Sequence, residues 1–247
     1  MNQGILEICV DNIASVEACA AAGVHRIELC SGLVEGGTTP SAGFLKVARG
    51  LYGGRIMMMI RPRSGDFIVS TQELDIMRTD IDMARAHGAD GVVFGCLHPD
   101  GRIDERVLSI LMDSAAGMDV TFHRAFDVSV SLTASLETLI RHGVPRVLTS
   151  GGMPCVAQGA GPLAALHMQS SGRITLLAGG GLNASLLPGL RAAGLREFHL
   201  SGRRSAESPM EFRRTDIPMG ATEVPGEYIR RQADPAMLRD LLNAIRG

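Results

Sequence analysis

Ala21-Ala22-Gly23-Val24-His25-Arg26-Ile27-Glu28-Leu29 carries the main structural signal: a helix end closed by glycine, followed at once by a short apolar strand. Glycine suits this position because the residue past a helix end often needs a left-handed backbone. The pattern recurs at Ala86-His87-Gly88-Ala89, Arg141-His142-Gly143-Val144 and Ala192-Ala193-Gly194-Leu195. Gly53, Gly117 and Gly172 hold similar places before strands predicted at 55–60, 120–123 and 174–178. The chain is therefore expected to alternate helices with strands.

These joints and an opening strand at Ile5–Val10 predict eight strands that alternate with helices. Such alternation implies right-handed parallel βαβ units, and eight of them close most naturally into a (β/α)8 TIM barrel. The alternative is an open doubly wound sheet, which would need a glycine-rich nucleotide fingerprint after an early strand. Gly179-Gly180-Gly181 comes late in the chain and lacks that spacing.

Composition narrows the class of protein. The 247 residues are 45% hydrophobic and 20% charged, with a net charge of -2, which excludes a disordered chain. The balanced charge, the absence of Trp and the lack of a basic block argue against nucleic-acid binding. Apolar runs are too short for a membrane span, and early acidic residues exclude a signal peptide. Five cysteines without CxxC spacing indicate reduced thiols, so we expect a cytoplasmic protein.

One domain, 1–247, accounts for the whole chain. Before the last helix, predicted at 234–246, a segment at about 202–233 is rich in charge, glycine and proline. A connection of that length is uncommon unless it acts as a lid or a contact surface. We expect it to cover the mouth of the barrel, although a plain surface loop or a subunit contact would fit equally well.

Strand alternation predicts which side chains point into the barrel. Each strand's outer face meets helices and should be apolar, so the polar residues between point inward or to the mouth. The predicted interior set is Glu7, Cys9, Glu28, Cys30, Met57, Met59, Arg61, Thr121, His123, His199 and Ser201. Because a buried charge is costly unless paired, we expect Glu7 and Glu28 to face Arg61, Arg63 or Arg124.

This polar set indicates an enzyme acting on a small anionic or phosphorylated compound. Glu7, Glu28 and His123 could transfer protons, and Arg61, Arg63 and Arg124 could hold an anion by forked hydrogen bonds. His199, Ser201, Gly151, Gly179 and Gly180 lie at the same strand ends, where barrels often bind phosphate through bare backbone N–H groups. The alternative is that the charges are internal salt bridges and that the glycines only permit tight turns.

Several strings of sequence resemble the CutC family, which is named for copper homeostasis. They include Leu6-Glu7-Ile8-Cys9, Arg26-Ile27-Glu28-Leu29-Cys30, Gly36-Gly37-Thr38-Thr39-Pro40-Ser41, Ile60-Arg61-Pro62-Arg63-Ser64-Gly65-Asp66-Phe67, Thr121-Phe122-His123-Arg124-Ala125-Phe126-Asp127, Arg146-Val147-Leu148-Thr149-Ser150-Gly151 and Ser208-Pro209-Met210. The resemblance covers nearly the whole chain, and residues 213–225 fit the family pattern only loosely. It implies a cytosolic TIM barrel, a homo-oligomer, and a copper homeostasis protein that binds or traffics Cu(I).

Cu(I) is soft and prefers thiolate and thioether ligands. Cys9 and Cys30 are predicted on neighbouring strands at similar heights, so they are the candidate copper ligands, and Met57, Met59, His123 or His199 could complete a site. The alternative is that both thiols are small apolar packing residues. A copper phenotype could also arise indirectly from a metabolic defect, so the copper and enzyme hypotheses do not exclude each other.

Overall fold

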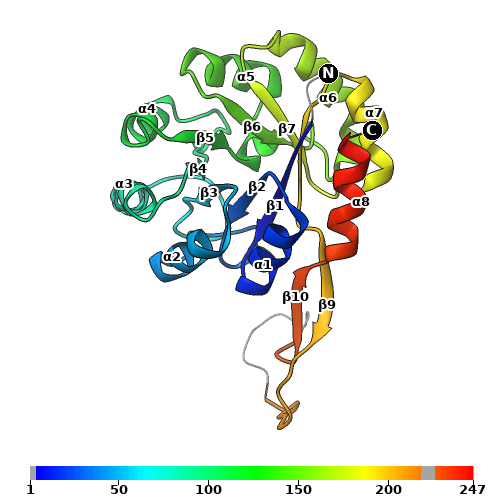
Figure 1. Ribbon diagram of the computed structural model, residues 1–247. Coiled ribbons are helices and arrows are strands. Elements are labelled where there is room, and N and C mark those ends of the chain that lie inside the picture. The colour runs from blue at the N-terminus through cyan, green and yellow to red at the C-terminus, as the bar shows by residue number, and fades with distance from the viewer. Residues whose placement is uncertain (1–3, 218–225, 247) are drawn as a thin grey trace.

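The computed structural model describes residues 4–217 and 226–246, which form a closed barrel of eight parallel strands inside a ring of helices (Figure 1). The strands pair in chain order, and β8 pairs with β1 to close the barrel. This confirms the predicted (β/α)8 barrel and excludes the open sheet. The barrel strands are β1 Ile5–Val10, β2 Arg26–Leu29, β3 Arg55–Met59, β4 Gly91–Phe94, β5 Asp119–Phe122, β6 Arg146–Thr149, β7 Thr175–Gly179 and β8 Glu197–Leu200.

The helices follow the strands as the periodic glycine pattern predicts. They are α1 Ile13–Ala22, α2 Ala42–Leu51, α3 Thr71–Ala86, α4 Glu105–Ser114, α5 Leu132–Arg141, α6 Val156–Ser170, α7 Leu187–Ala192 and α8 Pro235–Arg246, with short 3-10 turns η1 Leu33–Glu35, η2 Arg124–Val128 and η3 Ala184–Leu186. Gly23, Gly88, Gly143 and Gly194 all have the expected left-handed backbone. Gly53 differs, because α2 ends in Tyr52 with an extended backbone (φ -120°).

Two separate apolar clusters confirm the predicted side-chain alternation. Leu6, Ile8, Ile27 and Leu29 belong to the large cluster between the strands and the helices. Cys30, Met57, Met59 and Val93 form a small cluster of their own, at positions of the opposite parity. Residues of that second parity therefore share the interior of the barrel, as the polar set requires.

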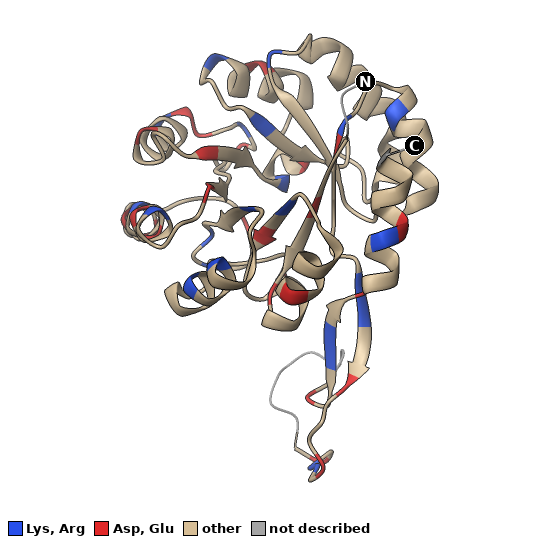
Figure 2. Ribbon diagram, viewed as in Figure 1, with Lys and Arg blue, Asp and Glu red and all other residues tan. Residues whose placement is uncertain are grey.

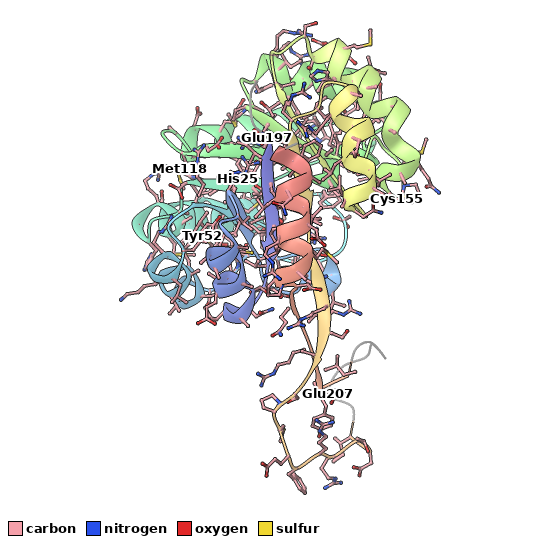
Figure 3. The ribbon with its side chains drawn as sticks, turned by 45° about the vertical axis from the view of Figure 1, so that its right-hand side comes forward. His25, Tyr52, Met118, Cys155, Glu197 and Glu207 are labelled. Atoms are coloured by element: carbon pink, nitrogen blue, oxygen red, sulfur yellow. The ribbon has the colours of Figure 1, made fainter. Side chains whose placement is uncertain are left out.

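The segment after β8 forms a two-stranded antiparallel sheet of β9 Arg203–Glu207 and β10 Ile229–Ala233. This hairpin projects away from the barrel (Figure 1). Figure 3 shows Glu207 on the hairpin, well away from Glu197 at the start of β8. Only the base of the hairpin reaches the mouth, and residues 218–225 lie outside the described part of the chain. A cover over the mouth therefore stays a prediction.

None of the helices in the described residues has the length and apolar character that crossing a bilayer requires.

Candidate functional site

Ion pairs close the end of the barrel opposite the mouth. Arg26 on β2 contacts the carboxylate of Glu7 on β1 and lies 2.5 Å from that of Glu197 on β8. Arg146 on β6 bridges Glu197 at 2.7 Å and Asp119 on β5 at 3.0 Å. These residues stand at or near the starts of their strands and share the inward parity. Because each buried charge has a partner, the network offsets its desolvation cost.

The network differs from the expected pairing. Glu7 pairs with Arg26 and not with an arginine of the mouth. The sequence does indicate that Arg26 and Glu197 point into the barrel. Arg26 is two residues before Glu28, and Glu197 is two residues before His199, so each shares the inward face of its strand. Parity alone does not indicate which of these charges meet, because that depends on the register between the strands.

His199 connects this network to the mouth. Its Nδ1 lies 2.7 Å from Glu7 Oε1, and its Nε2 lies 3.8 Å from Glu28 Oε2. Burial alone would lower the pKa of His199, but the charge of Glu28, with further contributions from Cys9 and Glu7, raises it well above the usual value. His199 is therefore a buried imidazolium held between two carboxyl groups.

The surroundings shift the pKa values of these two carboxyl groups in opposite directions. Burial would raise the pKa of Glu7, but Arg26 and His199 lower it to about 2, so Glu7 is a permanent anion. Burial raises the pKa of Glu28, and the charge of Glu7 adds to this although His199 opposes it. Glu28 Oε1 has no hydrogen-bond partner, and Oε2 accepts one from the Cys30 thiol at 3.4 Å. Glu28 is thus the carboxyl suited to gain and lose a proton.

A cavity of about 520 Å³ opens at the mouth. It is lined by Cys9, Glu28, Leu33, Glu35, Gly36, Met59, Arg61, Phe67, His123, Arg124, Leu148, Gly180, Gly181, Leu182, His199, Leu200, Ser201, Gly202, Arg203 and Met237. Within the described residues, the buried side-chain atoms that lack a hydrogen-bond partner are Glu28 Oε1, Arg61 Nε and His123 Nε2. All three belong to residues that line this one cavity. Buried polar groups without a partner are rare and costly, so their gathering here makes this cavity the candidate site.

The cavity brings together most of the predicted site residues. The lining includes Cys9, Glu28, Arg61, His123, Arg124, Gly180, His199 and Ser201. Glu7, Cys30, Arg63, Gly151 and Gly179 are not among the described lining residues. Glu7 acts from behind His199, whereas Cys30 lies buried against Glu28.

Arg63 and Gly151 are occupied elsewhere. The Arg63 guanidinium is half-exposed and binds Asp66 and Glu73, because the loop after β3 turns its side chain outward. The Gly151 N–H donates to Thr149 Oγ1 at 2.8 Å, so it is not free for an anion. Gly180 does approach the site closely: an added Cβ would lie 3.2 Å from the Arg124 guanidinium.

Cys9 and Cys30 occupy different levels of the barrel. Cys9 is opposite Glu28 in the β1–β2 register, so Cys30 stands one inward position nearer the mouth. A sulfur of Cys9, a carboxylate oxygen of Glu28 and a ring nitrogen of His199 lie within 4.8 Å of one another. These three groups are of the kinds that bind metal ions. They include one thiol and one imidazole, whereas the sequence analysis suggested two thiols, Cys9 and Cys30.

Comparisons with known proteins assign the family. A model of the CutC family matches residues 4–204. This chain belongs to the CutC family. A family protein CutC of Porphyromonas gingivalis is 44% identical over 243 residues, which are 98% of each chain. The copper homeostasis protein cutC homolog of Mus musculus is 43% identical over 245 residues, 99% of this chain and 90% of the relative.

The solved structures agree with the CutC assignment. The crystal structure of a CutC protein from Streptococcus agalactiae superposes with a TM-score of 0.76 at 30% identity, covering 80% of this chain and 98% of that one. A thiamine phosphate pyrophosphorylase from Pyrococcus furiosus reaches a TM-score of 0.59 at 16% identity, covering 98% and 95%. That second likeness concerns the barrel fold alone.

Proposed function

We propose that the mouth cavity is an active site that transfers a proton on a small anionic substrate, as an isomerase or a lyase does. The observation that supports this most is that three residues, each with one unpartnered buried polar atom, line one cavity. A barrel that needed only stability would fill these positions with apolar side chains.

In this proposal Glu28 is the general base or acid, and His199 is its partner across 3.8 Å. Glu7 is a positioning residue, because it contacts His199 Nδ1 from behind and fixes the ring. Arg61 supplies positive charge to the bound anion, and Arg124 lines the same cavity. The guanidinium of Arg124 is held in place by Asp127 at 2.7 Å and by Ser150 at 2.8 Å.

The experiment is a turnover screen. A small-molecule extract is incubated with the wild-type protein, with Glu28→Gln, and with Glu17→Gln, which removes an exposed carboxyl on α1 as the matched control. We expect the wild type and the control to convert the same compound, followed by mass spectrometry, and Glu28→Gln to lose about 100-fold or more in rate. Equal conversion by Glu28→Gln and the wild type would contradict the proposal.

A second candidate function, Cu(I) binding, is favoured by the grouping of Cys9, Glu28 and His199. The thiol and the imidazole are suitable ligands for Cu(I). Glu7 would orient His199 from outside the ligand set, as carboxylates do for metal-binding histidines. Cys30 lies 3.4 Å from Glu28 and would join as the second thiol after a small movement. The names of the mouse and human relatives support this candidate.

An anaerobic titration of Cu(I) against a competing chelator tests this candidate. Cys9→Ser is expected to lose the tight site, and Glu7→Gln to weaken it about 10- to 100-fold. Cys155→Ser, which changes a thiol outside the cavity, serves as the matched control. Undiminished affinity in the Cys9→Ser, Cys30→Ser double variant would rule out a thiol site.

The five cysteines are all free, which supports the expected cytoplasmic location, because thiols persist in that reducing compartment. A homo-oligomer is proposed on the family resemblance, with the projecting hairpin as its contact.

A further inference from the structure

Two of the unpartnered donors approach the same aromatic ring. Phe67 lies in the loop after β3, and its ring centroid is 5.1 Å from the guanidinium carbon of Arg61. The same centroid is 5.0 Å from that of His123, which follows β5. Phe67 therefore holds a cationic side chain and an imidazole side by side at one wall of the cavity.

Arg61 is a buried cation without a carboxylate partner. Its NH1 donates to the carbonyls of Glu35 (3.0 Å) and Gly37 (2.9 Å), and its NH2 donates to that of Gly65 (2.9 Å). No acidic group in the described part of the chain lies within ion-pairing distance of it, and its Nε–H is unpartnered. Carbonyl groups fix the orientation of the guanidinium but do not neutralise it. A buried charge in this state needs an anion from outside the chain.

His123 supplies a second, uncharged donor. Its Nδ1 accepts a hydrogen bond from the N–H of Ala125 at 3.1 Å, so the ring proton is on Nε2, the atom without a partner. Burial lowers the pKa of His123 to about 3, with a further contribution from the charge of Arg61. The imidazole is therefore neutral at physiological pH, and it donates from Nε2.

We infer that Arg61 and His123 form the subsite for a carboxylate, so that the substrate of this CutC protein is a small carboxylic acid. This rests on the proposed function and adds the substrate class and its orientation. Arg61 Nε–H and His123 Nε2–H each donate to the bound carboxylate, and the rest of the molecule extends towards Glu28 on β2. No covalent change takes place at this subsite.

The charge of the Arg61 and His123 subsite favours a carboxylate over a phosphate. The subsite has one guanidinium and one neutral imidazole, which match a single negative charge. A phosphate would bring close to two charges. The other arginines of the lining, Arg124 and Arg203, are paired with Asp127 at 2.7 Å and with Asp11 at 3.9 Å. His199 lies between two carboxyl groups, and Glu35 lines the cavity as a further negative group. A dianion would thus be undercompensated.

Calorimetric titration and thermal shift test the subsite, with acetate, lactate and succinate as carboxylate probes and inorganic phosphate as the contrast. Ionic strength is held constant with chloride. At least one carboxylate is expected to bind saturably, with phosphate at least 10-fold weaker. Arg61→Lys and His123→Gln should each weaken it by about 10- to 100-fold, because each removes a hydrogen bond to a charged group. Arg63→Lys, at the neighbouring exposed arginine, should bind as the wild type does.

The outcomes separate this inference from the proposed function. Carboxylate binding that survives in Glu28→Gln, with turnover lost, would support both. Carboxylate binding that depends on Arg61 and His123, with no turnover in any screen, would support the subsite and contradict the proton transfer. Binding of phosphate in preference to every carboxylate, or carboxylate binding unchanged in both variants, would overturn the subsite. Arg61→Lys also removes hydrogen bonds to the mouth loops. Carboxylate binding by His123→Gln, in a protein with a native circular dichroism spectrum, is therefore the deciding measurement.

Discussion

The Nδ1 of His199 donates to the Oε1 of Glu7 across 2.7 Å, from β8 to β1 at the closure of the barrel. Through this contact, the ion pairs at the far end of the barrel fix the orientation of a residue in the mouth cavity, and Glu7 contributes to its positive charge together with Glu28. Polar contacts therefore run through the interior of the barrel from Arg26 through Glu7 to His199. Glu7 is part of the ion-pair network, and His199 lines the cavity.

Replacing Glu7 by Gln should destabilise the protein strongly. The change leaves Arg26 with Glu197, which it already shares with Arg146, and it leaves His199 beside a neutral group. Breaking a buried pair from one side costs about 3–5 kcal/mol, and we expect that loss in the free energy of unfolding measured with urea. The matched control is Glu105→Gln, which breaks the exposed pairs with Arg141 and His142 and should cost about 0–1 kcal/mol. Equal losses in the two variants would refute the buried network.

Stability should fall as the solution becomes acidic, with His123 as one cause. An unfolded chain protonates this imidazole near pH 6.5, whereas the folded protein resists protonation down to about pH 3. The unfolded state binds more protons within this window, so the free energy of unfolding decreases as pH falls through it. The contribution approaches about 1.4 kcal/mol per pH unit.

His123→Gln should remove that contribution. Glu7 adds a similar acid-side loss, but only below pH 4.5, because its pKa in the folded protein is about 2. The raised pKa values of Glu28 and His199 also contribute between pH 6.5 and about 5, but they do so in both proteins. The difference in urea unfolding between the variant and the wild type over this range therefore isolates His123. We expect a flatter dependence in the variant, and the same slope in both proteins would show that His123 is not buried as a neutral ring.

Two glycines of α6 should respond in opposite ways to alanine. An added Cβ at Gly159 would lie 1.7 Å from the carbonyl oxygen of Ser150, which is backbone and cannot move aside. Gly161, two residues along the same helix, has open space at that position. Gly161→Ala should stabilise the protein by about 0.5–1 kcal/mol, since alanine is the better helix former. Gly159→Ala should destabilise it by several times that amount, as measured by thermal unfolding.

The hairpin should be the contact between subunits. Met210, Phe212 and Ile217 are exposed on it, and Phe212 has 71% of its surface accessible. Arginines lie along both strands near its base (Figure 2). Phe212→Asp should shift the protein to monomer in light scattering after gel filtration, because it places a charge in an apolar contact. An unchanged mass would remove the hairpin from the interface, and Val130→Asp, at another exposed apolar residue, is the control.

The barrel and its interior parity could be predicted because both follow from local rules. Glycine at helix ends and alternation within each strand predict Glu28, His123 and His199 in one interior compartment from the sequence alone. The partners of those side chains could not be predicted in the same way. Glu7 finds Arg26 because neighbouring strands bring their first inward residues level, and that register depends on the stagger of the whole barrel.

Loops limited the prediction further. Arg61 and Arg63 are two residues apart and have the same pattern in the sequence. In the structure, carbonyl groups of two loops hold the Arg61 side chain inward. Asp66 and Glu73 hold the Arg63 side chain outward. The contrast between Cys9, which lines the cavity, and Cys30, which is sealed beside Glu28, likewise comes from packing around Gly37. Sequence spacing contains neither fact.

Proton transfer by Glu28 is tested most directly by deuterium incorporation. Carboxylic acids from a cell extract are incubated in deuterated water with the wild-type protein or with Glu28→Gln, and the masses of recovered compounds are compared. We predict that one acid gains a deuteron on carbon with the wild type and that the gain falls about 100-fold with the variant. Labelling that is absent with the wild type, or that persists undiminished in Glu28→Gln, would contradict the assignment of Glu28 as the group that moves the proton.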